Sequence, residues 1–382
     1  MSAGVYISGV GELPQGHSDQ PNPMSLHAEL CRLALEDANL KWNQIDAVLT
    51  VSPRSDPYLI HAAALSEYLD ISPAVAWTLE AGGAAPAAML ETARGLITAG
   101  TCSNILIVAA DMPLSGVSRQ AYVKTLSEVG PVHPEYEVPY GPSVPTMFGL
   151  VARSYANRWG NIDKALAAVA MQNRAAACRH GNAHFREMFD AAAYRESRVI
   201  ADPLKLLDCA PVSDGGGALV VTGAPGARHV PVSGLGFSYS HMHLSAADDL
   251  CSFNAGKALD MALGQARASR DDLDLALIYD CFTIAMLVNL EDMGLAERGR
   301  AGQDFMDGRF APGGDLPVNT HGGLLSHGHP ARAGGIGNVV EGVVQLRGEA
   351  GQRQIPGAKL ALAHGMGGVF ATHGIALLGE PS

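Results

Sequence analysis

The 382-residue sequence repeats part of itself, and this duplication limits the folds that it can adopt. Residues 7–11 (ISGVG) recur as residues 232–236 (VSGLG), and residues 34–50 align without a gap to residues 262–278. The two offsets differ by only three residues, so the matches are collinear. Collinear repetition predicts two similar halves, each built from the same run of elements.

Each copy has the pattern of a helix, a polar turn and a short buried strand. The strands, residues 47–51 (AVLTV) and 275–279 (LALIY), are apolar almost throughout, as is typical of strands covered on both faces. In the second half the last two strands, residues 359–365 and 369–379, follow each other directly. In the first half the matching final strand, residues 217–223, comes about a hundred residues late.

This delay predicts a long insertion in the first half of a layered α/β protein. We expect residues 1–114 together with 205–226 to form an N-terminal half and residues 227–382 to form a C-terminal half. Residues 115–204 would then be an inserted loop domain.

Composition argues against several classes of function. The formal net charge is −12, and the sequence has no run of Lys and Arg that could bind nucleic acid. The six cysteines are scattered without a CxxC pair or a Cys/His cluster, so we expect reduced thiols and no metal in this chain. The N-terminus lacks a signal-peptide pattern, and no apolar run approaches the roughly 20 residues that span a bilayer. These features favour a cytoplasmic protein without a membrane span.

Three strings resemble the thiolase superfamily. They are NTHGGLLSHGHPARAGGIG (319–337), DCAPVSDGGGALVV (208–221) and YDCF (279–282), of which Gly-His-Pro in its glycine-rich frame is the most specific. YDCF is similar to the His-Asp-Cys-Phe of the sterol-carrier-protein (SCP-x) thiolases and to the Tyr-Asp-Cys-Phe of thiolase-like side-chain aldolases. The resemblance implies an α/β thiolase fold with duplicated βαβαβαββ halves in a five-layer αβαβα arrangement, assembled as a homodimer. It also implies a CoA thioester as substrate.

The cysteine that thiolases acylate is missing. Its position falls on Gly83, and no Ser, Thr or Cys lies between Glu80 and Met89. Glycine cannot form an acyl-enzyme, so ordinary acyl transfer is not expected from this position.

Two residues are the main candidates for chemistry. Tyr279 stands where related thiolases have His or Asn, and its phenol could act directly as a base or acid on a substrate oxygen; it could also be a buried tyrosine with its hydroxyl satisfied by a neighbour. His329, in Gly-His-Pro, matches a histidine that contributes to an oxyanion hole, and this role needs no cysteine nucleophile.

The resemblance assigns further residues to the site. Cys281 matches an acid/base cysteine of the sterol-carrier type, although an ordinary buried thiol fits its position equally well. His364 occupies the place of a C-terminal catalytic cysteine, where it could act in acid/base chemistry or cap a loop, and Asn319 completes the catalytic set. Ala210 and Met147 lie in segments assigned to binding of the CoA thioester, with core packing as the alternative for Met147. Outside this set, we interpret His327 as a solvated loop residue.

Three functions remain open at this stage. The first is retro-aldol cleavage of a β-hydroxyacyl-CoA, with Tyr279 as base and His329 with nearby amides holding the enolate oxygen. In the family, aldolases of this kind work with a small zinc-ribbon/OB-fold partner, which would carry any zinc. The second is acyl transfer like that of acetyl-CoA acetyltransferases, using Cys281. The third is a non-catalytic subunit that binds acyl-CoA or scaffolds another enzyme.

Overall fold

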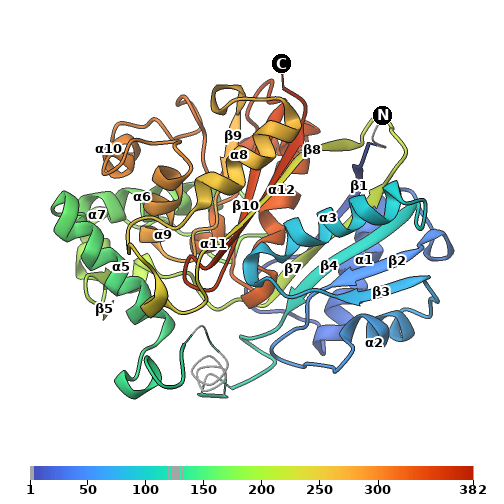
Figure 1. Ribbon diagram of the computed structural model, residues 1–382, viewed down its shortest axis with the longest axis horizontal. Helices are drawn as coiled ribbons and strands as arrows, with labels where there is room; N and C mark the ends of the chain where they lie inside the picture. Colours follow the sequence, from blue (N-terminus) through green and yellow to red (C-terminus); the bar gives the residue numbers. More distant parts are fainter. Residues whose placement is uncertain (1–3, 119, 122–129, 131, 382) are drawn as a thin grey trace.

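The computed structural model describes residues 4–118, 120–121, 130 and 132–381, and it is a layered α/β protein (Figure 1). Within these residues nine strands form one sheet in the order β3-β2-β4-β7-β1-β8-β11-β10-β9. The strands of the first half are β1 (Tyr6–Glu12), β2 (Ala47–Thr50), β3 (Val75–Thr78), β4 (Asn104–Asp111) and β7 (Gly215–Thr222). Those of the second half are β8 (Val230–Tyr239), β9 (Leu275–Leu277), β10 (Leu360–Gly367) and β11 (Thr372–Gly379). The predicted α/β class with a large central sheet is confirmed.

The two half-sheets are joined edge to edge. Strands β1 and β8 pair antiparallel over two positions only, Tyr6 with Pro231 and Ile7 with Val230. The expectation of two separate central sheets is therefore modified, because this short pairing makes the sheet continuous. In the second half the counterpart of β3 is reduced to an isolated parallel bridge between Ala276 and Val318.

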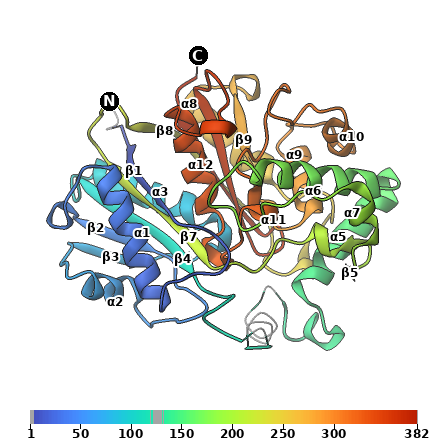
Figure 2. The same cartoon turned by 180° about the vertical axis from the view of Figure 1, so that it is seen from behind.

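Helices divide into an inner pair and two outer groups. Helices α3 (Ala85–Thr98) and α12 (Ile336–Leu346) each contact strands of both half-sheets and share one apolar core with them, so they lie between the halves. Helices α1 (Pro23–Asp37) and α2 (His61–Tyr68) cover the outer face of the first half-sheet. Helices α8 (Ala255–Ala266) and α9 (Thr283–Asp292) pack on the outer face of the second. Helices therefore lie on both faces of the sheet, and Figure 2 shows α1 in front of the strands of the first half.

The repeated Ser-Gly-x-Gly motif has a packing role in both halves. A Cβ on Gly9 would lie 2.2 Å from the carbonyl oxygen of Ala34 in α1, and a Cβ on Gly234 would lie 2.1 Å from that of Ala262 in α8. Real Cβ atoms do not approach so closely, so only glycine lets each outer helix rest on its strand. The matched glycine and the matched alanine therefore face each other across the same strand–helix contact in both halves.

The described part of the proposed insertion packs mainly against the second half. It contains helices α5 (Val144–Trp159), α6 (Asp163–Ala177) and α7 (Ala191–Glu196) and a two-stranded sheet of β5 (Val199–Ala201) and β6 (Leu204–Lys205). Helix α6 contacts α9, α10 (Ala301–Met306) and α11 (Gly323–Ser326), all of the second half. On the basis of these contacts we propose that the inserted domain comprises residues 115–204. No helix among the described residues is long and apolar enough to cross a membrane.

The buried pair His27 and His61 should make stability depend on pH. Among the described residues neither ring nitrogen of His61 has a hydrogen-bond partner, and burial, together with His27, lowers the pKa of His61 to about 3. An unfolded imidazole titrates near 6.5, so the stabilising neutral state is fully present above about pH 6.5 and is lost as the pH falls towards the folded pKa. We expect His61→Leu to reduce the fall in Tm between about pH 7.5 and about pH 5. The exposed His17, changed to Leu, is the control and should leave that fall unchanged.

Candidate active site

The turn after β9 holds Tyr279 in a fixed position. Its backbone N–H donates to Nδ1 of His364 at 3.3 Å, and its carbonyl accepts from Nδ2 of Asn289 at 3.2 Å. One residue earlier, the Asn319 side chain accepts from the Ile278 N–H at 2.7 Å and donates to the Ile278 carbonyl at 3.0 Å. The amide of Asn319 thus pairs with Ile278 as a neighbouring strand would.

The Tyr279 ring occupies the space that a side chain at position 83 would need. A Cβ built on Gly83 would lie 2.2 Å from Cε2 and 2.5 Å from Cζ of Tyr279. Gly83 lies just before α3, in the turn where thiolases would present their nucleophile. A side chain at position 83 and the Tyr279 ring therefore exclude each other in this arrangement.

Tyr279 and His329 form a pair. The phenol oxygen lies 3.3 Å from Nε2 of His329, and the two rings meet edge to face. The backbone N–H of His329 donates to Oγ of Ser213 at 3.1 Å, and its carbonyl accepts from the Ser213 N–H at 3.3 Å. Burial lowers the pKa of His329 to about 4, so its imidazole is neutral at neutral pH.

Asp280, the residue after Tyr279, holds this turn in place through buried hydrogen bonds. This fully buried carboxyl group accepts from the Leu324 N–H at 2.7 Å and from Nδ2 of Asn173. Burial raises its pKa to about 7 against the lowering effect of these hydrogen bonds. Asp280 therefore ties α6, α11 and the Tyr279 turn together. Its place in Tyr-Asp-Cys-Phe was the only sequence signal for this role.

Tyr279 and His329 line a cavity of ≈ 250 Å³. Gly83, Tyr279, Cys281 and His329 line it together with Ala210, and two arginines, Arg54 and Arg332, belong to its wall. The two arginines also line an adjoining cavity of ≈ 340 Å³. Sequence reasoning did not single out either arginine, because they come from separate loops of the two halves.

A larger apolar cavity of ≈ 600 Å³ adjoins the first. The two share Pro145, Ala210, Pro211 and Val212 as lining residues. Much of its wall comes from α6, from the segment before α7 and from the segments around β5 and β6: Ala170, Arg174, Phe185, Phe189, Ile200, Leu206 and Leu207. Most of these residues belong to the proposed insertion, which therefore contributes a binding surface.

The structure separates the predicted site residues into two groups. Tyr279, His329, Cys281 and Ala210 line the small cavity. His364 and Asn319 lie beneath it, 1% and 0% exposed, and they do not line it in the part of the chain that the structure describes. His364 Nε2 contacts Nδ1 of His373 at 3.1 Å, and burial lowers the pKa of His364 well below its usual value.

Three further residues for which the sequence suggested a role or an environment are Met147, Cys281 and His327. Met147 is 2% exposed and belongs to the apolar core, while Val144 and Phe148 of the same helix line the cavity. The thiol of Cys281 is buried, and burial followed by the charge of Asp280 raises its pKa well above the usual value. The interpretation of His327 as a solvated residue is wrong, because it is 3% exposed.

Comparison with known proteins points to one superfamily. Residues 236–380 match the family model described as thiolase C-terminal domain-like. An acetyl-CoA acetyltransferase of Methanothermobacter thermautotrophicus is 29% identical over 348 residues, covering 89% of this chain and 90% of its own. A 17-hydroxy-3-oxo-4-pregnene-20-carboxyl-CoA lyase of Mycobacterium tuberculosis is 28% identical, covering 91% and 92%. The solved structure of an Ltp2-ChsH2(DUF35) aldolase superposes with a TM-score of 0.86 at 24% identity, covering 99% of this chain and 98% of that one.

Proposed function

We propose that this chain, which belongs to the thiolase superfamily, is a retro-aldolase that cleaves a β-hydroxyacyl-CoA without forming an acyl-enzyme. The observation that carries the proposal is the Tyr279 phenol, which fills the nucleophile's space and lies 3.3 Å from Nε2 of a neutral histidine. Retro-aldol chemistry needs a base for the β-hydroxyl group and a stabilised enolate, but no nucleophile.

The proposed reaction uses the Tyr279–His329 pair as a proton relay. Tyr279 takes the proton of the substrate β-hydroxyl while its own proton passes to Nε2 of His329. The Cα–Cβ bond then breaks: its electron pair moves to the thioester as an enolate, and the β-carbon leaves as a ketone or an aldehyde. Tyr279 then gives a proton to Cα of the enolate and regains one from Nε2 of His329, which yields the shorter acyl-CoA and restores the pair. The positive end of α3, which begins beside Gly83 in the cavity wall, would stabilise the enolate oxygen.

Acyl transfer by Cys281 has less support. A nucleophilic cysteine needs a lowered pKa, and the pKa of Cys281 is raised by burial and by Asp280. A purely non-catalytic subunit would have no need to keep a neutral histidine against a phenol inside a cavity.

The larger cavity is the proposed site of the acyl group. Its ≈ 600 Å³ and apolar wall suit a bulky ring system better than a short chain, in keeping with the lyase from M. tuberculosis. Arg54 and Arg332, at the adjoining cavity, suit the anionic part of CoA. We further propose a homodimer, because edge strand β3 carries the half-exposed Trp77.

Narrowing the larger cavity should discriminate between substrates by size. Leu206 lines it and is 50% exposed, so Leu206→Trp adds bulk with little risk to folding. We expect kcat/KM for bulky acyl groups to fall by about tenfold and that for short acyl groups to be unchanged. Leu150→Trp, at an exposed leucine that does not line the cavity, is the control. Equal losses for both acyl sizes would contradict this assignment.

The test of the function is a substrate panel followed by mass spectrometry of products and protein. The chain is incubated with β-hydroxyacyl-CoA and β-ketoacyl-CoA thioesters, alone and with a small zinc-ribbon/OB-fold partner. Release of a ketone or aldehyde without a protein adduct supports the lyase. Cleavage of the ketoacyl substrates that requires free CoA and leaves an adduct on Cys281 would establish acyl transfer instead.

A further inference from the structure

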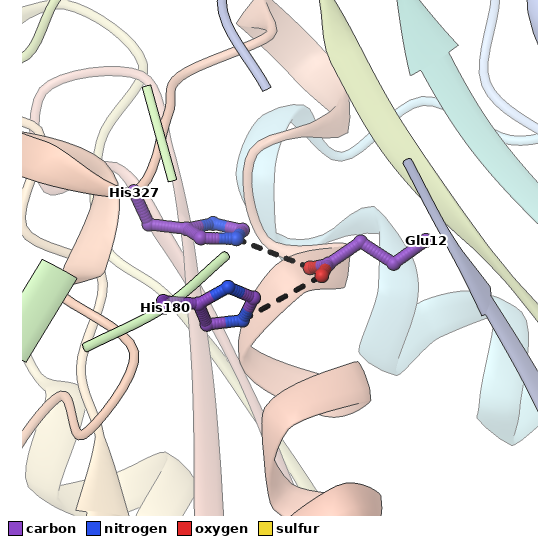
Figure 3. Close-up of side chains that lie close together, drawn as sticks. All are labelled: Glu12, His180 and His327. Atoms are coloured by element: carbon purple, nitrogen blue, oxygen red, sulfur yellow. Dashed lines mark ion pairs between the residues drawn. The ribbon is translucent and has the colours of Figure 1, made fainter. Parts of the chain in front are cut away.

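Three ligand-type side chains meet away from the cavity that contains Tyr279. Glu12 lies at the end of β1, His180 follows α6, and His327 follows α11 (Figure 3). One carboxylate oxygen of Glu12 lies 3.1 Å from Nε2 of His327, and the other lies 3.6 Å from Nε2 of His180. One ligand atom from each of the three lies within 4.8 Å of those of the other two. Figure 3 shows both imidazoles directed at the carboxylate.

We propose that Glu12, His180 and His327 bind a divalent transition-metal ion, with Zn²⁺ as the best match. Two imidazoles and one carboxylate are a common ligand set for such ions, and Zn²⁺ binds these atoms at about 2.0–2.2 Å. Two ligands at that distance in tetrahedral geometry are about 3.3 Å apart. The two Glu12 contacts, one to each carboxylate oxygen, bracket this separation. Bringing all three ligand atoms from within 4.8 Å of one another to this separation requires rotation of the side chains.

His327 gives an independent reason to expect a ligand. The side chain is 3% exposed, and among the described residues its Nε2 lies 3.1 Å from a Glu12 carboxylate oxygen without hydrogen-bond geometry. His321, with its ring centroid 5.0 Å from that of His327, also leaves a buried ring nitrogen without a partner in the described chain. Buried polar atoms are ordinarily satisfied, and a metal would satisfy the first of these.

The backbone around the cluster is already fixed. The Gln15 N–H donates to the Asn182 carbonyl at 2.8 Å, and the His184 N–H donates to the His327 carbonyl at 2.8 Å. The Asn182 side chain donates to Glu12 at 2.8 Å, which leaves the carboxylate oriented towards the histidines. Metal sites need such supporting contacts, since they orient the ligands.

An ion can reach the cluster from outside. A cavity of ≈ 260 Å³ is lined by Glu12 and His180 together with Glu341 and Arg353. The positive charge of Arg353 is compensated by Glu341, with which it forms an ion pair at 2.8 Å. Burial alone would raise the pKa of Glu12, but His327, His180 and Asn182 hold it below its usual range, so the carboxylate is ionised.

The ion would hold the Gly-His-Pro turn in a fixed position. His327 is two residues before His329, so a metal would link that turn to β1 and to the segment after α6. The proposed site stands on its own residues and does not depend on the retro-aldolase assignment. Its expected consequence is structural: a higher Tm with metal than without it.

The test is metal binding by the full chain after treatment with a chelator. We expect one Zn²⁺ per chain by dialysis and elemental analysis, an increase in Tm, and a visible Co²⁺ spectrum of low-coordinate nitrogen and oxygen ligation. Glu12→Gln, His180→Gln and His327→Gln should each weaken binding by at least about tenfold. His229→Gln, at a partly exposed histidine outside the cluster, is the matched control and should bind normally.

Two results would overturn the site. One is the absence of stoichiometric Zn²⁺ and Co²⁺ binding by the wild-type chain. The other is unchanged binding by all three variants, which would place the ion elsewhere. Circular dichroism verifies that the variants fold, and the Co²⁺ spectrum of the wild type provides evidence that needs no variant. None of these readouts involves a CoA substrate, so failure here is distinct from failure of the proposed function.

Discussion

Tyr279→Phe is expected to lower kcat for β-hydroxyacyl-CoA cleavage by about 100-fold or more, the usual contribution of a positioned acid or base. Phenylalanine keeps the ring that packs on Gly83 and removes only the hydroxyl group that contacts His329. The loss should therefore appear in kcat, with KM and Tm near the wild-type values. Steady-state kinetics on a substrate that the panel identifies, with a melting curve of the same preparation, measures all three.

Two comparisons make this result specific. Tyr68→Phe changes a tyrosine that is 53% exposed and lies outside the cavities described above, so it should have wild-type kinetics. His329→Gln removes the proton acceptor of the relay, so it should also lower kcat while leaving the Tyr279 ring in place. If Tyr279→Phe cleaves the substrate at the wild-type rate, Tyr279 is a packing residue and the proposed base must be found elsewhere.

The fold was largely predictable because its signals are local. The Ser-Gly-x-Gly repeat and the matched alanines Ala34 and Ala262 reflect a steric demand that only a few residues meet, so duplication preserved them visibly. Buried strands likewise show as apolar runs. The joining of the half-sheets was not predictable, since it depends on two residue pairs at the ends of β1 and β8.

The sequence named residues that meet around the small cavity, but it did not show where each side chain points. The sequence showed that Gly83 and Tyr279 both depart from the thiolase pattern, but not that one makes room for the other. His364 and Asn319 have the chemistry of catalytic groups, yet the structure uses both to hold the backbone of residues 278 and 279. That use depends on which atoms point where, and side-chain type does not determine this.

The metal cluster was missed for a different reason. Glu12, His180 and His327 come from distant parts of the chain, and none has a neighbouring ligand at a spacing typical of metal motifs. Only the packing of the segment after α6 between β1 and α11 brings them together. The expectation of no metal was based on local sequence motifs. Such motifs cannot reveal ligands that only the fold brings together.

Gly83→Ala is expected to destabilise the protein by about 1–3 kcal/mol, the usual cost of overpacking a core. The new Cβ would meet the Tyr279 ring at 2.2 Å and the Met366 carbonyl oxygen at 2.5 Å. Gly95→Ala, inside α3, is the matched control: among the described residues nothing lies within 4 Å of its Cβ, and it should stabilise by about 0.5–1 kcal/mol. Urea unfolding of both variants measures the difference.

The coupling between positions 83 and 279 can be measured with Gly83→Cys. This variant restores a thiol but should show no acyl transfer, because the Tyr279 ring occupies the space where the thiol must sit. Adding Tyr279→Ala should recover part of the lost stability, with an interaction energy of about 1–3 kcal/mol in the double-mutant cycle. Recovery should be incomplete because the Met366 carbonyl remains in contact. Additive effects of the two changes would show that glycine and tyrosine are independent, and an acyl adduct on the single variant would show that the tyrosine does not displace the nucleophile.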